Sequence, residues 1–164
     1  METNDPLEQA ETLLKPWSKE MERPSAERLD ATVTVDTLLS AVQALAAASW
    51  GYLSAITGLD DSQAPASEQD ANGGQITVLY HFCQGPFVTT LRLHVPLSDA
   101  KVPSICGIVP SAVLYERELA EMFGLAIEGI PDDSRLLLPD DWPAEVYPLR
   151  KSFQGLPAEE PNEE

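Results

Sequence analysis

Apolar and polar positions recur along residues 31–124 with spacings that predict a series of short elements. The alternating run ATVTV, which begins at Ala31, predicts a strand. The run TLLSAVQALAAASW that follows predicts a helix with Asp36 as its N-cap. Helical spacing places five residues on its apolar stripe, namely Leu38, Leu39, Val42, Leu45 and Ala46. Aromatic and β-branched residues over 50–57 predict a second strand.

Two further strands, QITVLYHFC and VTTLRLHVPL, flank Gln84-Gly85-Pro86 and together predict a hairpin. Leu91, Leu93 and Val95 would share a buried face, opposite a partly wet face with Thr90, Arg92 and His94. A last helix would start near Ser111 as a cap and end at Gly124. Its expected buried side comprises Ala112, Tyr115, Leu119, Met122 and Phe123. The order of elements predicts an α+β, two-layer fold whose largely antiparallel or mixed sheet carries helices on one face.

Composition divides the rest of the chain into three parts. Residues 1–30 carry few large apolar groups, and Pro16 and Pro24 interrupt them, so we expect a loosely ordered arm with one short helix over 6–14. Residues 31–124 form the expected core domain and residues 125–153 an extended C-terminal strap. Residues 154–164 have the composition of a disordered acidic tail, and SQAPASEQDANGG predicts a flexible loop.

The formal net charge of −17 argues against nucleic acid or an anionic membrane as a direct ligand. The amino terminus lacks the pattern of a signal peptide, and no run approaches the roughly 18 apolar residues of a membrane span, so we expect a soluble, cytoplasmic chain. Cys83 and Cys106 form no closely spaced set, and we interpret them as two buried thiols.

Four charged residues crowd one and a half turns of the last helix, namely Glu116, Arg117, Glu118 and Glu121. Arg117 and Glu121 are four apart and can pair. Glu118 and Glu121 could also form an acid–base pair, but catalysis would require burial and a pocket that the sequence does not reveal. We therefore interpret the group as a salt-bridging face, either in solvent or between subunits.

His81, Cys83 and His94 fall on the two paired strands and could in principle hold zinc. A half-buried sheet face gives the same pattern, and the spacing has no knuckle. The chain also has no serine in a nucleophile elbow and no phosphate-binding glycine loop. Residue chemistry alone therefore indicates no enzyme and no bound cofactor or metal.

The strap inserts large apolar residues among its acids, and leaving them in water would forgo roughly 1.5–3 kcal/mol each. Either this domain or a partner must receive them, and Trp, Tyr and Arg are the residues that interfaces favour. The candidate partner residues are Arg135, Leu137, Pro139, Asp141, Trp142, Tyr147, Pro148, Leu149, Arg150 and Lys151.

Two motifs in this stretch resemble a known family. The helix motif E-R-E-x-x-D-M-F-G is matched by Glu116-Arg117-Glu118 and Glu121-Met122-Phe123-Gly124. The strap motifs R-R-I-L-x-P-x-D-W and P-L-R-K-D are matched by Arg135-Leu136-Leu137-Leu138-Pro139, Asp141-Trp142 and Pro148-Leu149-Arg150-Lys151. Over residues 31–153 the chain is similar to the thirty-kilodalton subunit of respiratory complex I, which is the C subunit of NADH-quinone oxidoreductase. It is also similar to the matching domain of energy-converting nickel–iron hydrogenases, including formate hydrogenlyase.

The chain departs from these motifs at four positions. Glu121 replaces an aspartate, Ser134 the first of two arginines, Ile130 the histidine of G-H-P, and Ser152 the aspartate after R-K. Contacts that relatives make through that histidine or aspartate cannot be carried over to Ile130 and Ser152. Tyr147 before Pro-Leu-Arg-Lys looks closer to the hydrogenase branch.

The resemblance implies a scaffold subunit without redox centres in the hydrophilic arm of a complex I-like NADH:quinone oxidoreductase. Its expected partners are the D-type large subunit, clasped by the strap, and the iron–sulfur subunits. The parent complex would supply iron–sulfur clusters with NADH and quinone, or a nickel–iron site, and would attach the chain peripherally to the cytoplasmic side of the cell membrane. An energy-converting hydrogenase is the alternative parent. A free-standing carboxylate- or metal-dependent enzyme is the alternative of another class.

Overall fold

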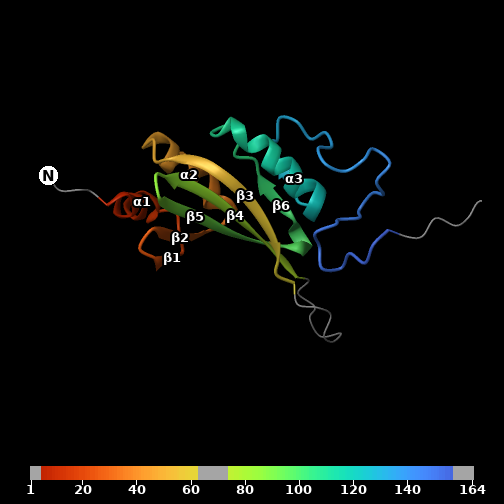
Figure 1. Cartoon of the computed structure of the whole chain (residues 1–164), viewed down its shortest axis with the longest axis horizontal. Helices are drawn as coiled ribbons and strands as arrows, with labels where there is room; N and C mark the ends of the chain where they lie inside the picture. Colours follow the sequence, from red (N-terminus) through yellow and green to blue (C-terminus); the bar gives the residue numbers. More distant parts are fainter. Residues whose placement is uncertain (1–4, 63–73, 157–164) are drawn as a thin grey trace, which may run out of the picture.

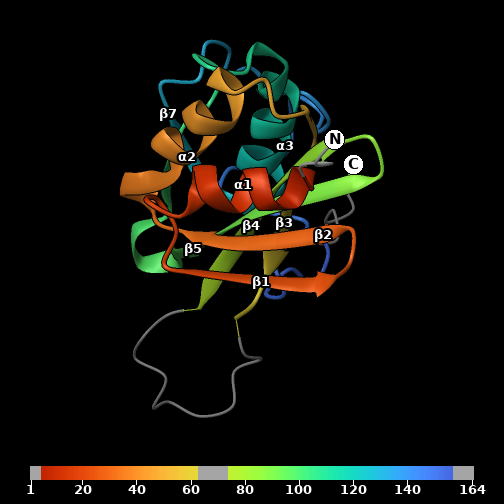
Figure 2. The ribbon, with the colours of Figure 1, turned by 90° about the vertical axis from the view of Figure 1, so that its left-hand side faces the viewer.

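A computed structural model describes residues 5–62 and 74–156 of the chain. Its centre is a five-stranded sheet with the strand order β1-β2-β5-β4-β3. The strands are β1 (Glu20–Ser25), β2 (Arg28–Val33), β3 (Tyr52–Asp60), β4 (Gln75–Gln84) and β5 (Phe87–Pro96). All pairs are antiparallel except β2 with β5. The three α-helices lie on one side of this sheet, which confirms the predicted α+β class with a mixed sheet (Figures 1 and 2).

The hairpin of β4 and β5 forms as the alternation predicts. Gly85 has φ +59° in its turn, where a side chain would be strained. Leu91, Leu93 and Val95 are fully buried beneath the helices, whereas His94 on the opposite face is exposed. The long-range pairing of β2 with β5 places the start of the predicted core domain next to the central strand of the sheet.

Helix α2 (Val35–Ala47) begins one residue before the expected cap. Thr34 is its N-cap, and its hydroxyl accepts a hydrogen bond from the Thr37 amide in a capping box, so Asp36 lies in the first turn instead. The buried stripe consists of Leu38, Ala41, Val42 and Leu45. Leu39 and Ala46 are exposed, because the buried stripe is centred on the side of the helix that carries Ala41.

The short helix predicted over residues 6–14 forms, but the described part of segment 1–30 is not the loosely ordered arm that its composition predicts. Helix α1 (Pro6–Leu14) buries Leu7, Ala10 and Leu14 completely. The indole of Trp50 donates a hydrogen bond to the Pro6 carbonyl at 2.8 Å, and β1 pairs with β2. Three apolar residues on one side of a short helix suffice to complete the core, and the charged remainder faces outward.

Helix α3 (Val113–Phe123) follows a 3₁₀ turn over Pro110–Ala112, and no side chain caps its start, so the expected Ser111 cap is absent there. Gly124 ends the helix in the left-handed conformation, as predicted. A short 3₁₀ turn (Leu97–Asp99) precedes β6 (Lys101–Pro103), which pairs in parallel with β7 (Ala126–Glu128). Residues 129–156, which comprise most of the strap and the start of the tail, form no helix or strand.

Two predicted segments lie largely outside the described residues, namely most of the polar loop after Asp61 and the last part of the acidic tail. Within the described part of the chain, no helix has the length and apolar content that a membrane crossing requires.

Candidate partner interface

The α3 helix holds the loop that precedes it through Glu116. This side chain is 1% exposed, and its carboxylate accepts hydrogen bonds from the Ile105 amide at 2.7 Å and the Ser104 hydroxyl at 2.6 Å. The Cys106 thiol lies 3.1 Å from the same carboxylate. The pKa of this thiol is raised, mainly by burial and further by the nearby Glu116 carboxylate. Glu116 therefore accepts hydrogen bonds from the donors of a buried loop and does not form the predicted salt bridge with any described residue.

Arg117 and Glu121 do not pair with each other in the described structure, although their spacing predicts it. The Arg117 guanidinium lies 3.2 Å from the Asp132 carboxylate and donates to the Ser134 and Arg135 carbonyls at 2.8 Å each. Both residues lie on the side of α3 that meets the strap, so long-range contacts replace the weak helical pair.

The Glu121 carboxylate accepts hydrogen bonds from three consecutive amides of the strap. The donors are Leu136, Leu137 at 2.8 Å and Leu138 at 3.3 Å. Successive N–H groups that converge in this way form a concave anion site. An acid–base role for Glu118 with Glu121 is not supported, because Glu121 is occupied in this way and neither side chain is buried. Glu118 has no hydrogen bond or ion pair to the described residues.

The carboxyl end of α3 is capped by the second half of the strap. The Leu149 amide donates to the Met122 carbonyl at 3.1 Å, and Arg150 Nε donates to the Phe123 carbonyl at 2.6 Å. The last carbonyls of a helix have no partners within the helix. A cation at this end also interacts favourably with the partial negative charge of the helix dipole. The Arg150 guanidinium in turn lies 4.4 Å from the centre of the Tyr147 ring, which packs on Gly124.

The remaining strap contacts are internal or reach the sheet. Arg135 donates to the Trp142 carbonyl at 2.9 Å, and the Trp142 indole donates to the Val146 carbonyl at 2.9 Å. The Lys151 amide donates to the Asp60 carboxylate at 2.8 Å, at the end of β3. Burial raises the pKa of Asp60, but hydrogen bonds from Ser62 and Lys151 outweigh it and the net pKa is lowered.

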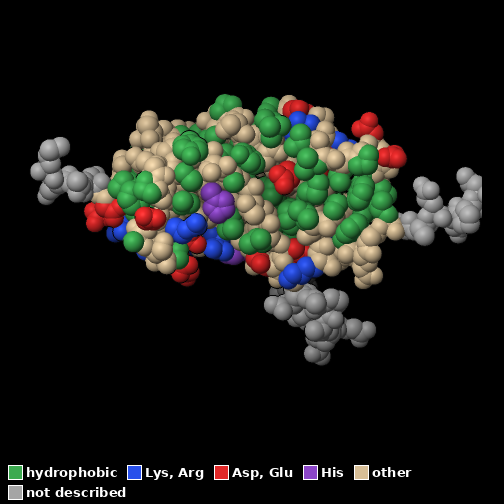
Figure 3. All heavy atoms as spheres, viewed as in Figure 1, with side chains coloured by type: hydrophobic (Ala, Val, Ile, Leu, Met, Phe, Trp, Pro, Cys, Tyr) green, Lys and Arg blue, Asp and Glu red, His purple; other side chains and the backbone are tan. Residues whose placement is uncertain are grey.

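These contacts divide the ten candidate partner residues into two groups. Arg135, Trp142, Tyr147, Arg150 and Lys151 contact this chain, and Pro139 accepts from Arg135. By contrast, Leu137 is 58% and Leu149 52% exposed, while Asp141 is exposed and Pro148 half-buried. In the view of Figure 3, hydrophobic side chains gather on the surface over α3 and the strap.

The predicted zinc candidates are not brought together. His81 pairs with Thr90 across β4 and β5, whereas His94 pairs with Thr77, so the two histidines are four residues apart along the ladder, roughly 13 Å at 3.3 Å per residue. Their Nδ1 atoms lie 3.0 Å from the Thr90 hydroxyl and 2.9 Å from the Thr77 hydroxyl. Burial and nearby Arg28 lower the pKa of His81. Within the described ranges, no three His, Cys, Asp or Glu side chains form a metal-binding group.

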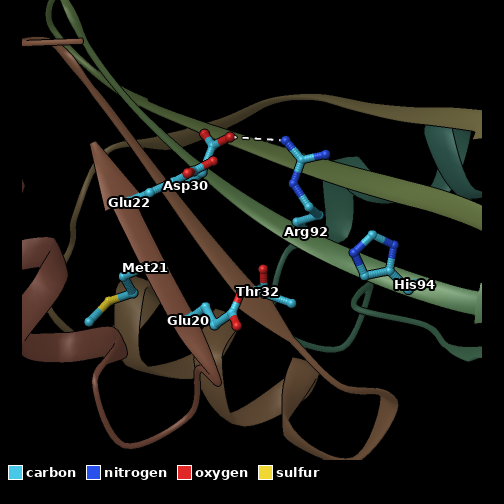
Figure 4. Close-up of a pocket in the computed structure, with 7 residues that line it drawn as sticks. All are labelled: Glu20, Met21, Glu22, Asp30, Thr32, Arg92 and His94. Carbon is cyan, nitrogen blue, oxygen red and sulfur yellow. Dashed lines mark hydrogen bonds and ion pairs between the residues drawn. The ribbon is translucent and has the colours of Figure 1, made fainter. Parts of the chain in front are cut away.

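His94 instead borders a hollow on the open face of the sheet (Figure 4). The hollow has a volume of about 470 Å³ and crosses β1, β2 and β5. Arg92 and Asp30 form an ion pair there at 3.0 Å, and the Glu22 side chain points toward this ion pair. Within this hollow, the charges of Arg92 and Asp30 thus neutralise each other.

The geometry defines an α+β domain whose carboxyl-terminal strap folds back on helix α3 and leaves apolar side chains exposed. Residues 31–159 match the family described as the respiratory-chain NADH dehydrogenase, 30 Kd subunit, and the chain belongs to that family. This confirms the family resemblance that the two motifs indicate.

Among relatives, formate hydrogenlyase subunit 5 of Escherichia coli is 37% identical over 128 residues, covering 76% of this chain and 21% of the relative. The C/D subunit of NADH-quinone oxidoreductase from Pseudomonas fluorescens is 35% identical over 104 residues, covering 62% of this chain and 17% of the relative. The chain thus spans about a fifth of the length of these relatives. In the solved structure of the membrane-bound sulfane sulfur reductase, an archaeal respiratory membrane complex, one chain has the same fold. Its TM-score is 0.70 at 23% identity, covering 92% of this chain and 86% of that one.

Sequence reasoning missed the roles of Glu116 and Glu121. Glu116 lies at helical spacing with Leu119 and Phe123, which predicts the buried side of α3, but a carboxylate there is hard to assign without its donors. The amides that Glu121 binds are 15 to 17 residues away. Spacing along a helix gives no signal for such contacts.

Proposed function

We propose that this chain is a non-redox scaffold subunit in the hydrophilic arm of a complex I-like NADH:quinone oxidoreductase. Its strap clasps the D-type large subunit, beside the iron–sulfur subunits that carry the redox centres. The observation that carries this proposal is a strap whose path is fixed by α3 while Leu137 and Leu149 stay exposed. Attachment to the cytoplasmic side of the membrane is then indirect, through the complex.

The energetics support a protein partner for this surface. Burying a leucine side chain contributes roughly 1.5–3 kcal/mol, and two exposed leucines on an ordered strap keep that gain available for association. The strap is already held by hydrogen bonds from Arg117 and to Glu121. A partner therefore meets a pre-formed surface and need not offset the entropy of ordering it.

The relative named as a C/D subunit supports the choice of a D-type partner. The segment similar to this chain makes up 17% of that polypeptide, so a C-like segment and a longer remainder are covalently joined there. Two units joined in one polypeptide lie near each other at high effective concentration. By analogy, the separate chain would bind a separate D-type subunit.

The test is recovery of the large subunit with a tagged chain that carries Leu137→Ser and Leu149→Ser. We expect the large subunit to be lost from the purified complex, because a buried interface anchor contributes about 2 kcal/mol or more. Leu39→Ser on α2 is the matched control, since Leu39 is 39% exposed and far from the strap in sequence. Thermal unfolding of each isolated variant shows whether the fold is kept. Recovery of a complete, active complex with the double variant would rule out the strap as a clasp.

A hydrogenase parent is the second candidate. The similarity to formate hydrogenlyase subunit 5 extends over 128 residues, longer than the 104 residues shared with the C/D relative. The genes beside this one discriminate between the parents. A large subunit with nickel-binding cysteines, together with nickel in the purified complex, would favour a hydrogenase, and a large subunit without them would favour quinone reduction.

A further inference from the structure

A cleft of about 310 Å³ lies between α3, β7 and residues 130–134 of the strap. It is one of several hollows on the described surface, and it adjoins the residues through which α3 holds the strap. Its volume is at the lower end of the roughly 300–1,000 Å³ of small-molecule sites. The cleft therefore has room for a large side chain but little more.

The floor of this cleft is aliphatic. Leu125 is buried, Ile127 and Ile130 are half-buried, and Ala120 and Ala126 complete the lining. Ile130 stands where the family motif has a histidine, so this wall is apolar in this chain. An aliphatic floor favours an apolar occupant, because water in the cleft finds few hydrogen-bonding partners there.

The polar groups around the cleft are already engaged, with one exception. Glu121 binds the strap amides, and Arg117 binds Asp132 and the carbonyl of Ser134. Asp133, which also lines the cleft, has no hydrogen bond or ion pair to any described residue. A small-molecule site would present several convergent polar groups. This cleft presents one unpaired carboxylate beside an apolar floor.

We propose that the cleft is a socket for one apolar side chain of the partner subunit, flanked on the partner by a lysine or arginine that pairs with Asp133. The inference rests on the proposed function and identifies the chemistry of the group that this surface receives. Charge complementarity supports the choice, because Asp133 has no ion pair with a described residue and the chain has a formal net charge of −17. The socket is also continuous with the strap, since residues 130–134 belong to both.

The experiment measures the affinity of the full-length chain for the purified large subunit of the parent complex. Ala126→Phe fills the socket from an exposed position, so the fold is expected to survive. An interface anchor excluded from its pocket should weaken Kd at least about thirtyfold. Ala47→Phe, at an exposed alanine of α2, is the matched control and should leave Kd unchanged.

Asp133→Asn tests the charge separately. Removing one exposed ion pair should weaken Kd by only a few fold and should reduce its dependence on salt. Asp36→Asn, an exposed acid on α2, should change neither quantity. A photoreactive phenylalanine analogue at position 126 should form a cross-link, in the assembled complex, to a partner peptide that contains an apolar residue next to a lysine or arginine.

The outcomes separate this inference from the function on which it rests. If Ala126→Phe binds like the unmodified chain while Leu137→Ser with Leu149→Ser does not, the socket is wrong and the clasp stands. If the cross-link is to an acidic or uncharged peptide, the proposed partner chemistry is overturned. If all of these variants bind normally, the proposed function fails as well.

Discussion

The carboxylate of Glu116 accepts a hydrogen bond from the Ile105 amide at 2.7 Å, in a site where the side chain is 1% exposed. A buried donor that loses its acceptor costs about 1–3 kcal/mol, and hydrogen bonds to charged groups contribute about 1.5–3 kcal/mol each. Glu116→Ala should therefore lower the free energy of unfolding by about 3 kcal/mol, as measured by urea denaturation. Glu116→Gln keeps one acceptor and should lose about half as much. Equal stability of all three proteins would contradict a structural role for this carboxylate.

Glu121→Gln should loosen the strap without unfolding the domain. Its three amide contacts lie at the surface, so we expect a loss of only about 1 kcal/mol in global stability. Hydrogen exchange at the amides of Leu136, Leu137 and Leu138 should become faster, because their common acceptor loses its charge. Glu118→Gln is the control, since Glu118 makes no polar contact to the described residues. Unchanged exchange in Glu121→Gln would mean that the strap is held by its other contacts.

Gly124→Ala should separate the second half of the strap from α3. Gly124 has φ +68°, and a methyl group there would overlap the Tyr147 ring. The left-handed backbone alone costs an alanine about 1 kcal/mol, and the displaced ring adds to it. We expect a decrease of about 2 kcal/mol in the free energy of unfolding and faster proteolysis near Tyr147. Gly107→Ala, where a methyl group would meet open space, should change neither.

Acid should release the end of the strap from β3. The net effect of its surroundings is to lower the pKa of Asp60, so the folded state favours the ionised form. The stabilisation is complete above the ordinary aspartate pKa of about 3.9 and is lost as the pH falls through the lowered pKa of the folded protein. Asp60→Asn should remove this part of the acid dependence in urea denaturation at a series of pH values. An identical dependence in the variant would show that other carboxylates account for it.

The sequence predicts the parts of the fold that depend on local periodicity. The alternation of apolar residues predicts β4 and β5 because one face of the sheet is buried beneath the helices, and Gly124 ends α3 because a left-handed residue is needed there. The arm over residues 1–30 could not be predicted in this way. Its charge suggests a solvated segment, whereas the burial of Leu7 and Leu14 follows from the packing of α1 on α2, β2 and β5, which are distant in sequence.

The same distinction applies to the candidate site. The motifs around Arg117 and Arg150 can be recognised from their order along the chain, but their partners cannot. Arg117 contacts residues 15 to 18 positions away, and Arg150 donates to a carbonyl 27 positions away. Such contacts follow from how the strap returns to α3, which no short window of sequence contains. The exposed leucines could be named as interface candidates, but the division between anchoring and exposed residues needed the fold.

Helix α1 has a practical consequence for the choice of fragments. The family match begins at residue 31, which lies in the middle of β2 (Arg28–Val33). An expression fragment cut at that boundary would divide β2, an interior strand of the sheet, and delete both β1 and the helix whose Pro6 carbonyl binds Trp50. The boundary of similarity is therefore not a folding boundary, and recombinant studies of this domain should retain the chain from at least residue 5.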